Sequence, residues 1–210
     1  MVEFTDMKSK TRVLRIDASA SVSTSNSKKL GDALIARMEA LHPGMQVQQR
    51  DLNEDISFID EAWVGANFTT PEERSEMQKQ RLEFSDQLID EIRHADHIVL
   101  TTPMYNFSIP APLKAWIDLI CRAGVTFQYS ADGPVGLLKN KRVDIIMTTG
   151  GVPLQSPADF ASDYLKQIFR FIGFEDINIF AADQMNVDAD ASYQNALDQM
   201  VQSYAMNDAA

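Results

Sequence analysis

Apolar positions along the chain follow two alternating patterns, short runs and helical spacing, which predict strands and helices in turn. Short apolar runs predict strands over residues 12–17, 45–50, 97–102, 142–149 and 176–182. Between them, apolar residues recur three or four positions apart and predict helices, from Leu30 to Leu41 and over residues 72–94, 111–123, 157–172 and 189–206. This alternation is typical of an α/β protein, in which helices cover both faces of a parallel sheet.

The order of these elements favours one topology. Right-handed crossovers leave few arrangements of five parallel strands, and the first crossover here goes to an edge strand. We therefore predict a flavodoxin-like three-layer sandwich with a five-stranded parallel sheet in the order 2-1-3-4-5. Two long connections, 51–71 and 124–140, contain no predicted element, although Trp63 and Phe68 indicate that the first one packs on the fold.

Composition narrows the class of protein. The chain has 210 residues, 45% of them hydrophobic, and a formal net charge of −11. A negative surface repels phosphate backbones, so no nucleic-acid partner is expected. The single cysteine, Cys121, lies on the apolar side of a predicted helix, which indicates packing in a reducing compartment. We expect one domain over residues 11–210, after an N-terminal extension over residues 1–10.

No signal-peptide core and no run of about 20 apolar residues is present, so a soluble cytoplasmic protein without a membrane partner is expected. His94 and His97 straddle a helix end and a strand with no third ligand nearby, which argues against a metal site. The chain contains no GxSxG motif, so a serine hydrolase is unsupported.

In this topology ligands bind beyond the carboxyl ends of the strands, between strands 1 and 3. The loop after strand 1 opens a helix and carries Ser19, Ser25, Asn26 and Ser27. Free backbone N–H groups at a helix N-terminus attract anions, so this loop is a candidate phosphate cradle, the alternative being an ordinary N-cap. There is neither a GxGxxG nor a GxxxxGK[ST] motif, so dinucleotide and P-loop sites are unsupported.

Two further loops reach the same edge of the sheet. After strand 3 the chain reads PMYNF (Pro103, Met104, Tyr105, Asn106 and Phe107), which offers apolar contact and a directed amide to a flat ring. After strand 4 it reads TTGG (Thr148, Thr149, Gly150 and Gly151), where two glycines let the backbone approach a ligand. The alternatives are a turn with exposed aromatic side chains and a simple tight turn. Together the loops suit one phosphate and one planar ring, as in flavin mononucleotide (FMN).

At this point the residues resemble a known family. The carrying motifs are ASASVSTSNSKKL (18–30), PMYNFSIPAPLKAWIDLICRAGVTFQYSADGPVGLLKNK (103–141) and TTGG (148–151). They resemble the FMN-dependent NADH:quinone oxidoreductases known as azoreductases, of the flavodoxin-like superfamily. The resemblance extends from about Arg12 to Tyr204.

The resemblance implies one FMN per subunit of a homodimer, with NADH or NADPH as electron donor and the FMN sites at the dimer interface. Ser19 and residues 25–27 would hold the phosphate, residues 103–107 would flank the ring, and residues 148–151 would bind its pyrimidine edge. Tyr129 and Phe171 match positions that line the substrate pocket. The implied activity is two-electron reduction of quinones and cleavage of aromatic azo compounds to amines in a ping-pong scheme.

Because the flavin would carry this chemistry, no catalytic side chain is predicted. Thr149 and Pro153 depart from the pattern of several relatives, which leaves the preferred donor and acceptor open. The main alternative is a flavodoxin-type electron carrier without a small-molecule acceptor, and the two long connections argue against it because they can wall a pocket. A second alternative is a fold relative without flavin, against which the three-loop slot argues.

Overall fold

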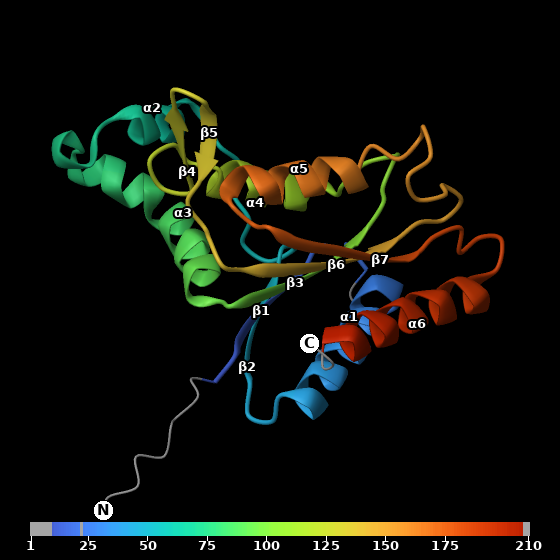
Figure 1. Ribbon diagram of the computed structural model, residues 1–210. Helices are drawn as coiled ribbons and strands as arrows, with labels where there is room; N and C mark the ends of the chain where they lie inside the picture. The colour runs from blue at the N-terminus through green and yellow to red at the C-terminus, as the bar shows by residue number, and fades with distance from the viewer. Residues whose placement is uncertain (1–9, 22, 208–210) are drawn as a thin grey trace, which may run out of the picture.

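The computed structural model describes residues 10–21 and 23–207. Its central sheet has five parallel strands in the order β2-β1-β3-β6-β7 (Figure 1). These strands are β1 (Arg12–Asp17), β2 (Gln46–Asp51), β3 (His97–Pro103), β6 (Arg142–Thr148) and β7 (Asp176–Ala182). The predicted extension over residues 1–10 lies outside the described residues apart from Lys10.

The flavodoxin-like α/β class with a parallel sheet is confirmed, and the strand order 2-1-3-4-5 needs correction to 2-1-3-6-7. The reason is a hairpin in the connection 124–140, where no strand was predicted. There β4 (Phe127–Ser130) and β5 (Gly133–Gly136) form a separate antiparallel pair. The fourth and fifth strands of the chain therefore stand outside the sheet, and the sixth and seventh complete it.

Helices cover both faces of the sheet (Figure 1). One face packs against α1 (Asn26–Leu41) and α6 (Ala189–Asn207), and the other against α3 (Glu76–His94), α4 (Ala111–Ile120) and α5 (Ser162–Ile172). The protein therefore has two apolar cores, one on each side of the sheet. The α1–α6 core contains Leu30, Leu34, Val99, Ile146 and Met200, and the larger core contains Leu88, Leu100, Trp116, Ile145 and Phe169.

Helix α3 begins at Glu76 rather than residue 72 and α4 ends at Ile120 rather than residue 123, and two regions differ more from the prediction. The connection 51–71, expected to be irregular, contains α2 (Glu61–Phe68) and the short 3₁₀ helix η1 (Pro71–Glu73), and the Asp60 carboxylate caps α2 by accepting from Trp63 N at 2.8 Å. Helix α5 begins five residues later than predicted, because the Asp159 carboxylate accepts from the backbone of Ala161 and Ser162 and holds the preceding residues in turns. It ends at Gly173, as predicted.

Within the described ranges, no helix combines the length and the apolar character needed to cross a membrane.

Candidate functional site

Backbone hydrogen bonds join four loops at the carboxyl ends of the strands into one frame. These bonds are Ala18 N to Thr101 O (2.9 Å), Met104 N to Thr148 O (2.8 Å), Thr149 N to Ala182 O (3.1 Å), Met185 N to Thr149 O (3.0 Å) and Asn186 N to Gly150 O (2.8 Å). The Asn26 amide reaches Met185 Sδ at 3.6 Å and links the last loop back to α1. The structure thus brings together the three loops predicted from the sequence, and adds the loop after β7, residues 183–188.

The first loop delivers buried hydroxyls to the N-terminus of α1. Ser19, Ser25 and Ser27 are 3%, 6% and 1% exposed, whereas Asn26 is exposed. Ser25 is the N-cap, and its hydroxyl accepts from Lys28 N at 3.3 Å and lies 3.1 Å from the Ser27 hydroxyl. No acidic side chain occupies the first turn of α1. Hydroxyls at an uncompensated helix N-terminus fit an anionic group such as a phosphate.

The second loop is a tight turn that presents aromatic side chains. Tyr105 and Ser108 exchange backbone hydrogen bonds of 2.9 and 3.1 Å around Asn106 and Phe107, whose φ values are +49° and +70°. A left-handed conformation is strained for a bulky aromatic residue, and such strain concentrates at ligand-binding segments. Tyr105 and Phe107 are 40% and 55% exposed. Within a single chain, this loop is therefore a turn with exposed aromatic side chains, which is the alternative named in the sequence analysis. Its neighbours Pro103 and Met104 are half-buried.

The third loop offers backbone rather than side chains. Thr148 and Thr149 are buried, and the Thr149 hydroxyl donates to Val152 O and accepts from Gln184 N, so it holds its own loop. A Cβ on Gly150 would lie 2.8 Å from Asn186 Nδ2, while one on Gly151 would meet no atom within 4 Å. The backbone beside Gly151 therefore faces open space against which a flat group can lie.

Tyr129 and Phe171 lie together, away from these loops. Phe127 contacts both, with its ring centroid 4.2 Å from that of Phe171 in a tilted arrangement and 5.6 Å from that of Tyr129 in an edge-to-face one. Phe171 lies in the last turn of α5, and the β4–β5 hairpin that carries Tyr129 packs against this end of the helix, whereas the TTGG loop leads to its N-terminus (Figure 1). The 11 residues of α5 span about 16 Å at the usual helical rise. Within one chain, the predicted pocket residues and the predicted cofactor loops therefore stand apart.

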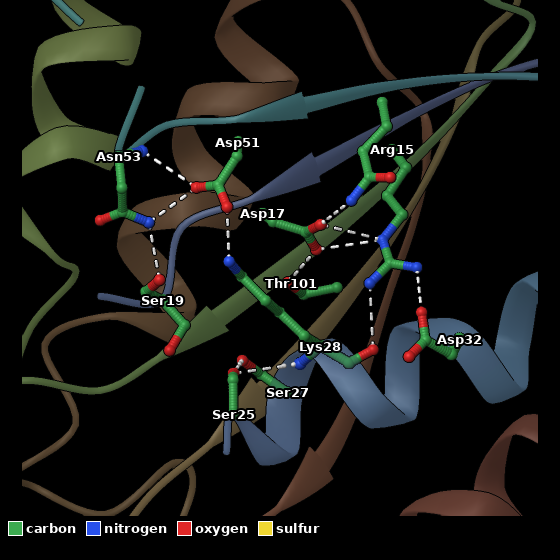
Figure 2. A network of polar contacts seen from close by, with 11 residues as sticks. Arg15, Asp17, Ser19, Ser25, Ser27, Lys28, Asp32, Asp51, Asn53 and Thr101 are labelled. Atoms are coloured by element: carbon green, nitrogen blue, oxygen red, sulfur yellow. Dashed lines mark hydrogen bonds and ion pairs between the residues drawn. The ribbon is translucent and has the colours of Figure 1, made fainter. Parts of the chain in front are cut away.

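Sequence reasoning missed the polar network beneath the loop after β1, which carries Ser19, Ser25 and Ser27 and is called the serine loop below (Figure 2). Asp17, the last residue of β1, is fully buried and accepts from Arg15 Nε (3.1 Å), Gln49 Nε2 (2.7 Å) and Thr101 Oγ1 (2.6 Å). Asp51, the last residue of β2, pairs with Lys28. Asp17 ends a predicted strand and Asp51 directly follows one, so the rule that places ligand sites at the carboxyl ends of strands could have drawn attention to them.

The described residues do not support a metal site or a nucleophilic cysteine. Among the described residues, no group of three or more His, Cys, Asp or Glu side chains could hold a metal ion. His94 bonds to the Asp90 carbonyl, and buried His97 bonds to Asp144. Burial raises the pKa of the Cys121 thiol to about 12, so it stays protonated and is a poor nucleophile.

Comparisons with known proteins identify the fold and the family of the chain. A family model described as a flavodoxin-like fold matches residues 11–204. A Hahella chejuensis protein named FMN-dependent NADH:quinone oxidoreductase 1 is 46% identical over 190 residues, which cover 90% of this chain and 93% of that protein. A Jannaschia protein of the same name is 43% identical over 190 residues, which cover 90% of this chain and 97% of that protein.

Among solved structures, an FMN-dependent NADH-azoreductase from Bacillus anthracis in complex with FMN superimposes with a TM-score of 0.83. It is 26% identical, and the match covers 93% of this chain and 98% of that one.

Proposed function

The chain belongs to the family of FMN-dependent NADH:quinone oxidoreductases with a flavodoxin-like fold, and on this premise we propose that it reduces quinones with NADH as the electron donor. The observation that carries the proposal is the four-loop frame. It joins a hydroxyl-rich helix N-terminus to a backbone opening at Gly151, in a chain 46% identical to such an enzyme. NADPH is the alternative donor.

The residues of the frame fit FMN. Ser19, Ser25, Asn26 and Ser27 would hold the phosphate, because their hydroxyls and amide lie at a helix N-terminus whose own first turn carries no acidic side chain. Residues 103–107 would flank the flavin ring, and Thr148, Thr149, Gly150 and Gly151 would contact its pyrimidine edge mainly through backbone groups. When bound, FMN supplies the chemistry of taking two electrons from the donor and passing them to the acceptor.

The side chains of the protein would then position the flavin and its substrates and shield them from water. No side chain is required as an acid or base. Tyr105 and Tyr129 are exposed enough to deliver protons, and water can replace them. The Asn106–Phe107 turn would present its aromatic side chain to the flavin, and the two backbone hydrogen bonds between Tyr105 and Ser108 hold its strained conformation in place. We therefore expect Tyr105→Phe and Tyr129→Phe to retain activity.

Aromatic azo compounds are the second proposed class of acceptor, supported by the structural match to an azoreductase. Cleavage of one N=N bond to two amines takes four electrons and four protons, and hence two NADH. Such an acceptor must stay bound, or bind again, for a second round. The quinone needs only one round, and this difference makes quinones the better substrates.

We further propose that the protein acts as a homodimer. The separation of Tyr129 and Phe171 from the loops of their own chain supports this, because a second copy could supply them to the site. Exposed apolar side chains near α2 and on or directly after the hairpin offer contact area, namely Phe58, Phe68, Met77, Val135 and Leu137. Sedimentation velocity of the FMN-loaded protein tests the proposal, and a monomer at micromolar concentration would contradict it.

The proposal also includes the domain organisation and the cellular location of the protein. The family match over residues 11–204 supports a single FMN-binding domain over residues 11–210, which limited proteolysis of the loaded protein should leave intact as one fragment. A single, mostly buried cysteine supports a cytoplasmic location, which cell fractionation tests.

The decisive experiment adds NADH anaerobically to the FMN-loaded protein and follows the visible absorbance of the flavin. We expect rapid bleaching and full recovery after benzoquinone is added, with protein stripped of FMN as the control. The electron-carrier alternative predicts no bleaching with NADH or NADPH. That outcome would overturn the proposed function while leaving the family and the fold in place.

A further inference from the structure

Two side chains, those of Asp51 and Asn53, connect the two ends of the serine loop (Figure 2). Asp51 Oδ2 accepts from Lys28 Nζ at 2.5 Å, in the first turn of α1. Asp51 Oδ1 accepts from the backbone and side-chain nitrogens of Asn53 at 3.0 and 2.7 Å. The Asn53 amide also donates to Ser19 O at 2.6 Å. Two side chains thus bridge from the helix, where the loop ends, to Ser19, where it begins.

Attraction for a phosphate does not explain this arrangement. The side chains of Lys28 and Asp51 are 14% and 23% exposed, so the pair is largely shielded from water. Burial by itself raises the pKa of Asp51, but the hydrogen bonds from Lys28 and Asn53 more than offset it and hold that pKa below its usual range. Asp51 is therefore an anion at neutral pH, beside a helix N-terminus that is suited to bind another anion.

Resting on the proposed function, we propose that Asp51, Asn53 and Lys28 form a brace that holds the serine loop in the shape that binds the phosphate of FMN. A loop that is ordered beforehand loses less conformational freedom when the ligand binds, so the brace raises affinity without touching the ligand. Asp51 and Asn53 are thus positioning residues, and their effect is specific to the phosphate end of the cofactor.

Coulomb's law alone predicts the opposite sign for Asp51. Asp51→Asn removes a negative charge near the phosphate, so electrostatics would tighten FMN binding. The brace predicts weaker binding, because the new amide group points a donor at the donors of Lys28 or Asn53. Asn53→Ala changes no charge, and only the brace predicts that it weakens binding. The two variants therefore separate positioning from charge.

The experiment titrates the full-length protein, stripped of flavin, with FMN and separately with riboflavin, and follows flavin fluorescence. Riboflavin lacks the phosphate and reports the ring subsite alone. We expect the Kd for FMN to rise about tenfold in Asp51→Asn and severalfold in Asn53→Ala, as loss of a charge-assisted hydrogen bond would give. The Kd for riboflavin should not change.

Glu54→Gln is the matched control, since it makes the same charge change on an exposed neighbour of the brace. It should leave both dissociation constants as they are. Thermal melting by circular dichroism checks folding, and if Asp51→Asn fails to fold, Asn53→Ala, at an exposed position, decides alone.

Three outcomes would overturn the brace while FMN still binds the wild type. These are tighter FMN binding in Asp51→Asn, unchanged FMN binding in both variants, or an equal loss for FMN and riboflavin, which would indicate general loosening. If the wild-type protein does not bind FMN at all, the proposed function fails, and the brace fails with it.

Discussion

Two fully buried aspartates, Asp17 and Asp144, lie toward opposite ends of the sheet and have similar surroundings. Each accepts hydrogen bonds from an arginine two residues away on its own strand and from side chains of neighbouring elements. Asp17 ends β1, beneath the serine loop. Asp144 lies near the start of β6, and His97 Nε2 (3.0 Å), Asn178 Nδ2 (3.1 Å) and the Tyr204 hydroxyl donate to it.

The two aspartates differ in the further contacts that their hydrogen-bond partners make. Thr101, which donates to Asp17, also accepts from Ala18 N in the loop frame, and Arg15 also donates to Lys28 O in α1. The described partners of Asp144 lie near the starts of β3, β6 and β7 and in the last turn of α6, away from the loop frame. The same buried chemistry should therefore affect cofactor binding at one end of the sheet and stability alone at the other.

The largest expected effect is that of Asp144→Ala. It removes the acceptor of buried His97 and of two Arg142 hydrogen bonds, and leaves the Arg142 guanidinium with Asp176 at 3.8 Å. We expect this to cost about 3 kcal/mol of the free energy of unfolding, measured in urea. The Kd for FMN should stay unchanged in the folded protein. Glu175→Ala, at an exposed position, is the control and should change stability by less than about 0.5 kcal/mol. A weakened Kd for FMN in Asp144→Ala would remove the distinction between the two ends.

Gly31→Ala should reduce stability less than Asp144→Ala does, but it should also weaken FMN binding. A Cβ there would lie 2.6 Å from Thr101 Cγ2 and 3.3 Å from Arg15 Nη2, so α1 must shift away from the sheet. Overpacking of about 2 kcal/mol, less about 1 kcal/mol of gained helix propensity, predicts a net loss of about 1 kcal/mol. The N-terminus of α1 moves with the helix, so FMN binding should weaken too.

Gly65→Ala in α2 is the matched control, because no atom lies within 4 Å of the added Cβ. It should gain up to about 1 kcal/mol from helix propensity and leave FMN binding unchanged. Equal effects of the two substitutions on FMN binding would contradict the link from Arg15 and Thr101 to the site.

The smallest effect is a pH dependence at Asp144. Burial by itself raises the pKa of this carboxyl, but His97, Arg142 and Tyr204 more than offset it and hold the pKa below its usual range. A depressed folded-state pKa contributes stability above the unfolded value of about 3.9, and this is lost as pH falls through the folded value. The advantage of wild type over Asp144→Asn should therefore shrink below pH 4, by at most about 1.4 kcal/mol per pH unit. An advantage that stays constant from pH 5 to pH 2.5 would count against this.

Much of the fold could be predicted because its signals are local. The apolar runs at 12–17 and 176–182 match β1 and β7 residue for residue, and Gly173 ends α5 in the left-handed conformation that favours glycine. Helix α2 and the hairpin were missed because both are short and weakly patterned. Their signals were present, in the Asp60 cap and in the turn dipeptide Asp132-Gly133, but such dipeptides also occur in irregular loops.

The candidate site could be predicted in part. Topology brings the ends of strands 1, 3 and 4 to one edge, so the three loops were found. The loop at 183–188 and the pairing of Lys28 with Asp51 were not, because contacts between residues distant in sequence leave no periodic signal. The resemblance also placed Tyr129 and Phe171 in a pocket, which their positions in one chain do not explain without a second copy.

The frame that joins the loops is built from backbone atoms, and this has a consequence for how the protein can change over generations. Side chains in these loops can be exchanged without loss of the bonds at Ala18, Met104 and Thr149, since every residue except proline carries the same N–H donor. Mutation can therefore retune which acceptors enter the slot while its outline is inherited intact. The exception is proline at one of those three positions, which would remove a donor and open the frame in a single step.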